Sequence, residues 1–166
     1  MLIDKYLPHY TYYEHHHTIV KAGAKNCFLT AKELDVSRSW ITKTLMKLRG
    51  LPTNDLKLQG FLQNICFTYI EEDPYKEFLI DASQPGLKIF WNFYFKSVAD
   101  NETIVSTETR ILCLSAKVKR RFSVYWFFIR PFSGLIRLEI LRLIKKKLVV
   151  SRNLQQANKT KATNNG

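Results

Sequence analysis

The sequence predicts a single α+β domain in which an antiparallel sheet is followed by a long, kinked C-terminal helix. Strand-like segments separated by tight-turn residues fill the middle of the chain, and an apolar stripe with helical spacing follows them. The chain has 166 residues, of which 46% are hydrophobic and 24% charged, as in one globular domain. We expect this domain over residues 1–150 and a disordered basic tail over residues 151–166, where large apolar residues are scarce.

The first fifty residues predict a strand flanked by helices. An apolar cluster in residues 1–9 that ends at Pro8 indicates one or a few helical turns. β-Branched and aromatic residues dominate residues 10–22, which predicts a strand. Helical spacing over residues 24–50, with a serine N-cap at position 37 or 39, predicts two short helices.

The middle of the chain predicts four further strands. Alternating, β-branched and aromatic segments mark them at residues 60–71, 76–82, 87–98 and 102–114. The connections contain turn-forming pairs and triplets: Asp73-Pro74, Gln84-Pro85-Gly86 and Asp100-Asn101. Short strands joined by tight turns predict an antiparallel meander rather than a parallel sheet.

After Ser115, a candidate N-cap, the period becomes helical. Large apolar residues recur every three or four positions and form one stripe: Val118, Phe122, Tyr125, Ile129, Phe132, Ile136, Ile140, Ile144 and Leu148. Pro131 lies inside this run, so we expect the helix to kink or restart there.

The net charge of +12 is confined to the last fifty residues. Residues 1–116 contain 13 basic and 13 acidic residues, whereas residues 117–166 contain 13 basic residues and Glu139 as the only acidic residue. Most of these cations fall off the apolar stripe and form a candidate anionic-surface site: Lys119, Arg120, Arg130, Arg137, Lys145 and Lys146.

This basic face has three interpretations. It can be a solvated outer face, or it can contact anionic lipid headgroups, for which Trp126, Phe127 and Phe128 beside Arg130 are suitable neighbours. Nucleic acid is the third partner class and the least favoured, because no recognised nucleic-acid-binding motif is present.

Several classes of site and location are not supported by the sequence. No apolar run is long enough to span a membrane, no secretory leader is recognisable, and three scattered cysteines favour reduced thiols in a cytoplasmic protein. No phosphate-binding, dinucleotide-binding or nucleophile-elbow motif occurs, so no cofactor is predicted. His15 and His17 share a strand face, but no third ligand has defined spacing, so no metal site is predicted.

The order of elements resembles the helix-grip fold of the START-like superfamily (SRPBCC), which includes polyketide cyclases, lipid-transfer domains and pollen allergens. The sequence also looks like an uncharacterised bacterial branch of this superfamily. This resemblance is carried by Pro85-Gly86 with Trp91-Asn92-Phe93, and by the segment from Ser106 through Arg120-Arg121-Phe122, Tyr125-Trp126, Ile129-Arg130-Pro131 and Ser133-Gly134-Leu135-Ile136-Arg137. Such folds usually carry six or seven strands, whereas five are counted here, so we expect a curved sheet of about five to seven strands.

The resemblance implies that the sheet wraps around the helix and that an apolar cavity lies between them. The candidate cavity residues are Trp91, Phe93, Phe95, Thr107, Thr109, Phe122, Tyr125, Trp126 and Ile129. Asn92, Glu108 and Arg110 form a candidate polar site. If Glu108 and Arg110 face inward they are a buried charged pair, and if outward a surface pair.

These residues lead to two functional interpretations of different classes. The first is binding of a hydrophobic or amphipathic small molecule, lipid-like or polyketide-like, in the cavity. The alternative is an enzyme of the polyketide cyclase or dehydratase type, which requires at least one titratable residue in the cavity.

Overall fold

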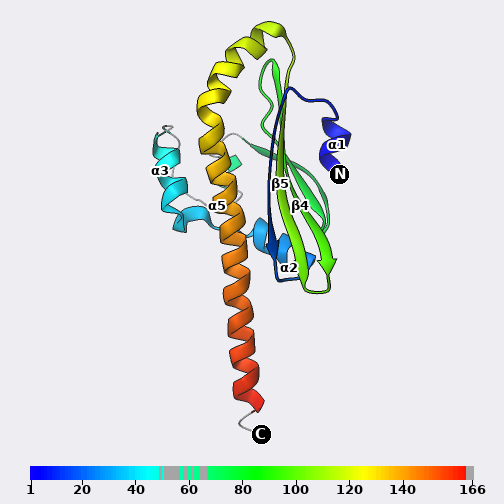
Figure 1. The fold of residues 1–166 in the computed structure, drawn as a ribbon, viewed down its shortest axis with the longest axis vertical. Helices are drawn as coiled ribbons and strands as arrows, with labels where there is room; N and C mark the ends of the chain where they lie inside the picture. The colour runs from blue at the N-terminus through cyan, green and yellow to red at the C-terminus, as the bar shows by residue number, and fades with distance from the viewer. Residues whose placement is uncertain (49, 51–56, 58–59, 61, 64–66, 164–166) are drawn as a thin grey trace.

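A computed structural model describes residues 1–48, 50, 57, 60, 62–63 and 67–163 (Figure 1). Its five antiparallel strands are arranged in the order β1-β5-β4-β3-β2. The strands are β1 (Tyr12–Val20), β2 (Thr68–Asp73), β3 (Glu77–Asp81), β4 (Leu87–Ala99) and β5 (Glu102–Cys113). The predicted α+β meander is confirmed, with the first strand paired to the last.

Two short helices follow the first strand, as predicted. They are α2 (Ala24–Lys32) and α3 (Trp40–Leu48), with a 3₁₀ turn, η1 (Val36–Arg38), between them. Ser39 caps α3, because its Oγ accepts a hydrogen bond from the Thr42 backbone N–H at 3.2 Å. A further short helix, α1 (Leu2–Tyr6), begins the chain.

One strand prediction is wrong at its start. The strand expected from residue 60 begins at Thr68, while residues 60, 62 and 63 are helical. Leu62 is buried in the main core, and its carbonyl accepts the Phe67 N–H at 2.8 Å, so this carbonyl is not paired with a neighbouring strand. Residues 61 and 64–66 and most of the expected loop over residues 51–59 lie outside the described residues.

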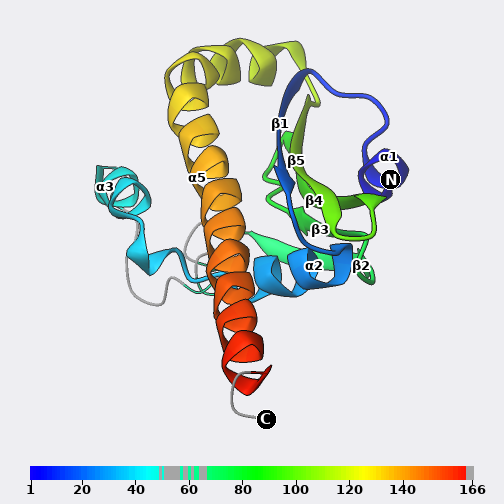
Figure 2. The same cartoon turned by 60° about the horizontal axis from the view of Figure 1, so that its bottom comes forward.

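The C-terminal helix, α5 (Ala116–Thr163), is continuous through Pro131. Figure 2 shows that it bends within its first third, which agrees with the kink expected from a proline that lacks an N–H and crowds the preceding turn. The helix also continues through residues 151–163, where a disordered tail was expected. Glutamine, alanine and lysine in this segment are good helix formers, which explains how a polar sequence extends the helix.

The two faces of the sheet are covered to different extents. On the inner face, α2 and α5 pack over the main core, which includes Phe28, Phe93 and Ile144. On the outer face, α1 and the residue after it bury Ile3 and Leu7 against β3 and β4 (Figure 1). A polar side chain that is buried on either face requires a partner.

The β3–β4 turn meets the first turn of α5 at Gly86. Gly86 has a φ of +83°, and the Gln84 and Leu87 backbones hydrogen-bond to each other across the turn at 2.8 and 2.9 Å. A Cβ at Gly86 would lie 2.8 Å from Val118 Cγ2. Glycine is therefore required both by the backbone conformation and by the close approach of α5.

Gly86→Ala should destabilise the protein more than Gly50→Ala. Gly50 also has a positive φ, +66°, but a Cβ at Gly50 would meet no described atom within 4 Å. The left-handed conformation alone costs roughly 1–2 kcal/mol, and displacing the stiff valine costs about 1 kcal/mol or more in addition. Urea unfolding of both variants measures the difference, and equal losses would contradict the Val118 contact.

Candidate functional site

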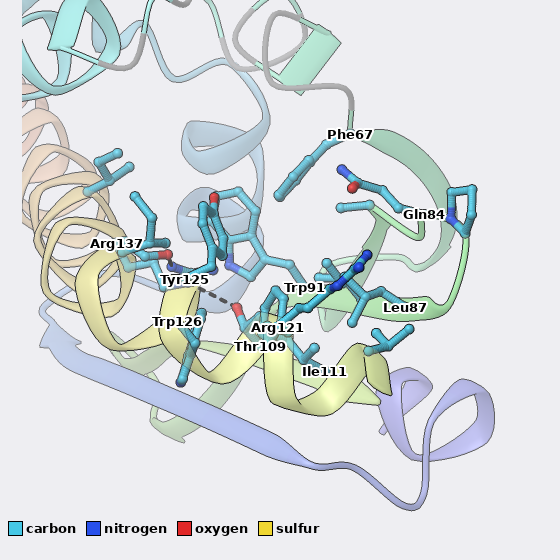
Figure 3. A pocket seen from close by; sticks show the side chains of 18 of the residues that line it. Phe67, Gln84, Leu87, Trp91, Thr109, Ile111, Arg121, Tyr125, Trp126 and Arg137 are labelled. Carbon is cyan, nitrogen blue, oxygen red and sulfur yellow. Dashed lines mark hydrogen bonds between the residues drawn. The ribbon is translucent and has the colours of Figure 1, made fainter. Parts of the chain in front are cut away.

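A cavity of about 730 Å³ lies between the sheet and the first half of α5 (Figure 3). Its floor is formed by β4 and β5, through side chains such as Trp91 and Ile111. The bent part of α5 covers it, and the β3–β4 turn, Met46 of α3 and Phe67 close its sides. The size is within the usual range for small-molecule sites.

Aromatic and aliphatic side chains dominate the cavity wall. Phe122 and Trp126 project from α5 and stack on each other with ring centroids 5.8 Å apart. With Ile111 they form a small cluster separate from the main core, and Tyr12 of β1 packs against both rings. This cluster closes the space between the bend of α5 and the edge of the sheet.

The structure places six of the nine predicted cavity residues in the wall. These are Trp91, Thr109, Phe122, Tyr125, Trp126 and Ile129. Phe93 and Phe95 instead fill the main core, where α2 and the C-terminal half of α5 leave them no open space. Thr107 donates to the Asn92 carbonyl at 3.0 Å and accepts from the Trp91 indole N–H, so it orients a cavity residue without lining the cavity.

Arg137 is the main correction to the predicted site. It was expected on the basic outer face, but it is only 6% exposed and lines the cavity. Its Nε donates to Thr109 Oγ1 at 2.9 Å, its Nη1 donates to Ser133 Oγ, and its Cζ lies 5.1 Å from the Trp91 ring centroid. Burial lowers the pKa of Arg137 to about 10, opposed by the charge of Glu14, so the guanidinium is charged at neutral pH.

Glu14 and His16 lie behind Arg137, between β1 and α5. Glu14 Oε2 is 3.7 Å from Arg137 Nη1, too far for a hydrogen bond, and Glu14 Oε1 is 3.1 Å from His16 Nε2. A Cβ at Gly134 would lie 2.7 Å from Glu14 Oε1, so the glycine makes room for this carboxylate beside the helix. Glu14 Oε2 is buried and has no hydrogen-bond partner among the described residues.

The sequence does contain a signal for this inward arginine. Arg137 precedes the buried Ile140, Leu141 and Ile144 by three, four and seven positions, the spacing of one helix face. Likewise, Glu14 alternates with Tyr13 and His15, so it points to the opposite face of β1 from them. Helical and strand periodicity therefore place both charges inward.

The candidate polar site lies on the other face of the sheet. Glu108 and Arg110 are buried on the opposite face of β5 from Thr109 and Ile111 of the cavity wall, and Arg110 hydrogen-bonds to Asp4 of α1. Arg110 donates to Glu108 Oε1 at 2.5 Å, to the Leu7 carbonyl at 2.9 Å and to Asp4 Oδ1 at 2.7 Å. Asn92 completes the network, accepting from the Glu108 N–H and donating to Glu77. These residues hold α1 on the sheet.

The other predicted surface cations are exposed along α5. Lys119, Arg120 and Arg130 lie near its bend, and Lys145 and Lys146 lie farther along. The rings of His15 and His17 lie side by side on the outer face, tilted by 31° with centroids 5.6 Å apart, and burial lowers the pKa of His15. In the described parts of the chain, no three His, Cys, Asp or Glu side chains are grouped to hold a metal ion.

No protein-family model matches the sequence, and a search of curated proteins finds no match. Among solved structures, norcoclaurine synthase from Thalictrum flavum, in complex with a transition state analogue, is similar with a TM-score of 0.49. The identity is 11%, over 85% of this chain and 96% of that chain.

Two further solved structures are similar to this chain. The di-domain ARO/CYC protein BexL of the BE-7585A biosynthetic pathway has a TM-score of 0.44 at 9% identity, over 86% of this chain and 48% of that chain. A START superfamily protein from Mycobacterium smegmatis has a TM-score of 0.38 at 8% identity, over 78% of this chain and 99% of that chain.

Arg110→Ala should destabilise the protein by about 3–5 kcal/mol, because it leaves the buried Glu108 carboxylate without its partner. Lys88→Ala is the control, since Lys88 is an exposed cation on the neighbouring strand and its loss should cost less than about 0.5 kcal/mol. Chemical denaturation of both variants provides the measurement. A loss for Arg110→Ala as small as that of the control would mean that this pair is solvated.

Proposed function

We propose that this protein binds a hydrophobic or amphipathic small molecule in the cavity beneath α5. The observation that carries the proposal is an apolar cavity of about 730 Å³ with one buried cation in its wall. Apolar walls with a few placed polar groups are typical of small-molecule sites, since the walls supply burial and the polar groups supply orientation.

The same wall favours binding over catalysis. Proton transfer is most efficient from groups whose pKa lies near the ambient pH, such as histidine or a perturbed carboxyl. Among the described residues of the wall, the ionisable side chains are Arg121, Tyr125 and Arg137, and none of these is a histidine or a carboxyl. A cyclase or dehydratase activity is therefore the less supported alternative.

A neutral fluorescent probe such as N-phenyl-1-naphthylamine should bind the protein, and Ile129→Trp should weaken binding at least tenfold. Ile129 lines the cavity and is half-buried, so an indole there occupies the space that the probe needs. Fluorescence titration gives the dissociation constants, and native mass spectrometry of the purified protein shows whether a lipid-like molecule is already bound.

Leu135→Trp is the matched control for this experiment. Leu135 is on the same helix, is 48% exposed and is not part of the cavity wall, so this change should leave probe binding intact. A wild-type protein that neither carries a small molecule nor binds the probe would show a closed core and overturn the proposal.

A second candidate function, binding to an anionic membrane surface, is favoured by the bend of α5. Phe127 is 76% exposed and Phe128 65%, and they are flanked along the helix by exposed Arg120, Arg121 and Arg130. Exposed aromatic side chains interleaved with cations suit an interface of apolar lipid and anionic headgroups. None of the helices in the described ranges is long and apolar enough to cross a bilayer, so we propose contact with the surface.

The double variant Phe127→Ser/Phe128→Ser should weaken binding to vesicles containing phosphatidylserine by tenfold or more. Each phenyl ring that enters the interface contributes roughly 1.5–3 kcal/mol, and 1.4 kcal/mol is a factor of ten. Co-sedimentation with these vesicles, and with pure phosphatidylcholine vesicles, measures affinity and charge preference. Trp40→Ser, which removes a 73% exposed aromatic residue from α3, is the control. Equal losses in both variants would contradict a specific role for the bend.

A further inference from the structure

The polar end of the cavity is formed by Arg137, Thr109 and Ser133. The guanidinium of Arg137 uses only some of its hydrogen-bond donors. An arginine has five N–H donors. The Nε hydrogen bond goes to Thr109 and one Nη1 hydrogen bond goes to Ser133, both neutral hydroxyls (Figure 3). Among the described residues, Nη2 has no hydrogen-bond acceptor. A charged group with remaining donors therefore borders the open space of the cavity.

The carboxylate of Glu14 does not bind the remaining N–H donors of this guanidinium. This carboxylate lies between β1 and α5, beside Gly134, and is not part of the cavity wall. At 3.7 Å it reduces the cost of burying the charge, but it makes no hydrogen bond to Arg137. Arg137, which lines the cavity, thus keeps N–H donors that the protein's own carboxylate does not bind.

The guanidinium is also held rigidly. Trp91 stacks against it at 5.1 Å, and Thr109 and Ser133 hold it from β5 and α5 respectively. The Trp91 ring is itself oriented by the hydrogen bond of its indole N–H to Thr107. A planar cation preorganised in an apolar wall matches a planar anion that accepts two hydrogen bonds.

We propose that the ligand of this cavity carries a carboxylate that binds the guanidinium of Arg137, with its apolar part directed toward the aromatic residues at the bend of α5. This inference rests on the proposed ligand-binding function and adds the chemical class of the ligand, an amphipathic carboxylic acid. The acid can be aliphatic or aromatic, since the wall offers both kinds of contact.

The test compares each acid with the alcohol of the same shape. Dodecanoate and 1-dodecanol form the aliphatic pair, and 4-biphenylcarboxylate and 4-biphenylmethanol the aromatic pair, each displacing N-phenyl-1-naphthylamine from the wild-type protein. We expect the acid of at least one pair to bind tenfold or more tightly than its alcohol, and the pair that shows this identifies the kind of acid. Arg137→Gln should abolish that preference while the neutral probe still binds.

Arg142→Gln is the control, because Arg142 is an exposed cation on the same helix that does not line the cavity. This variant should keep the preference for the acid. If the wild-type protein binds acids and alcohols equally, or if Arg137→Gln retains the preference, the inference is overturned although ligand binding stands. If neither the probe nor any of the four compounds binds, the proposed function itself fails.

A second measurement does not depend on whether Arg137→Gln folds. The carboxyl group of dodecanoate labelled with ¹³C at C1, or of the aromatic acid if that binds better, can be titrated by NMR while bound to the wild-type protein. A partner guanidinium should lower the pKa of the bound carboxyl below that of the free acid, whereas an apolar wall alone would raise it. A raised pKa would overturn the inference.

Discussion

The packing of α5 against the inner face of the sheet is the contact on which both the core and the cavity depend. In its C-terminal half, Ile140, Leu141 and Ile144 are buried in the main core with Phe93 of β4. Before the bend, α5 meets the sheet through the separate cluster of Phe122 and Trp126. The cavity is the space between these two contacts, so the bend near Pro131 determines where a packed core changes into an open site.

The two faces of the sheet use buried charge in different ways. On the outer face, Glu77 accepts hydrogen bonds from the Leu2 backbone and from Asn92, both at 2.7 Å, and Arg110 has three oxygen partners. Because the charged groups of this network have hydrogen-bond partners within the protein, the network orients α1 without a ligand. On the inner face, Arg137 and Glu14 each retain unused hydrogen-bonding capacity. Arginine and glutamate therefore hold α1 in place on the outer face, whereas on the inner face they belong to the site of the proposed ligand contact.

Much of the fold could be predicted because its periodicities are local. Alternation over residues 87–98 and 102–114 marked the long hairpin to within a residue at each end, and the apolar stripe marked α5. The burial of Glu108 and Arg110 could not be predicted in the same way, because it depends on α1 folding back over a strand more than a hundred residues later in the sequence. Phe93 and Phe95 were wrongly expected in the cavity wall, since periodicity identifies a buried face but not the point along it at which packing ends.

The segment of α5 from the bend to Arg137 is common to the two proposed functions, ligand binding in the cavity and contact with a membrane surface. Trp126, in the cavity wall, is followed directly by the exposed Phe127 and Phe128, so one helical turn carries both the wall of the cavity and the proposed lipid contact. At 1.5 Å per residue, Arg137 lies about 16 Å farther along the helix than Trp126, close to the extended length of a medium-length acyl chain. An amphipathic acid with its carboxylate at Arg137 would then end near the part of the surface proposed to touch a membrane. In that arrangement the apolar part of the ligand would enter the cavity last and leave it first, so at the proposed membrane contact it would pass through lipid rather than water, which would lower the cost of loading.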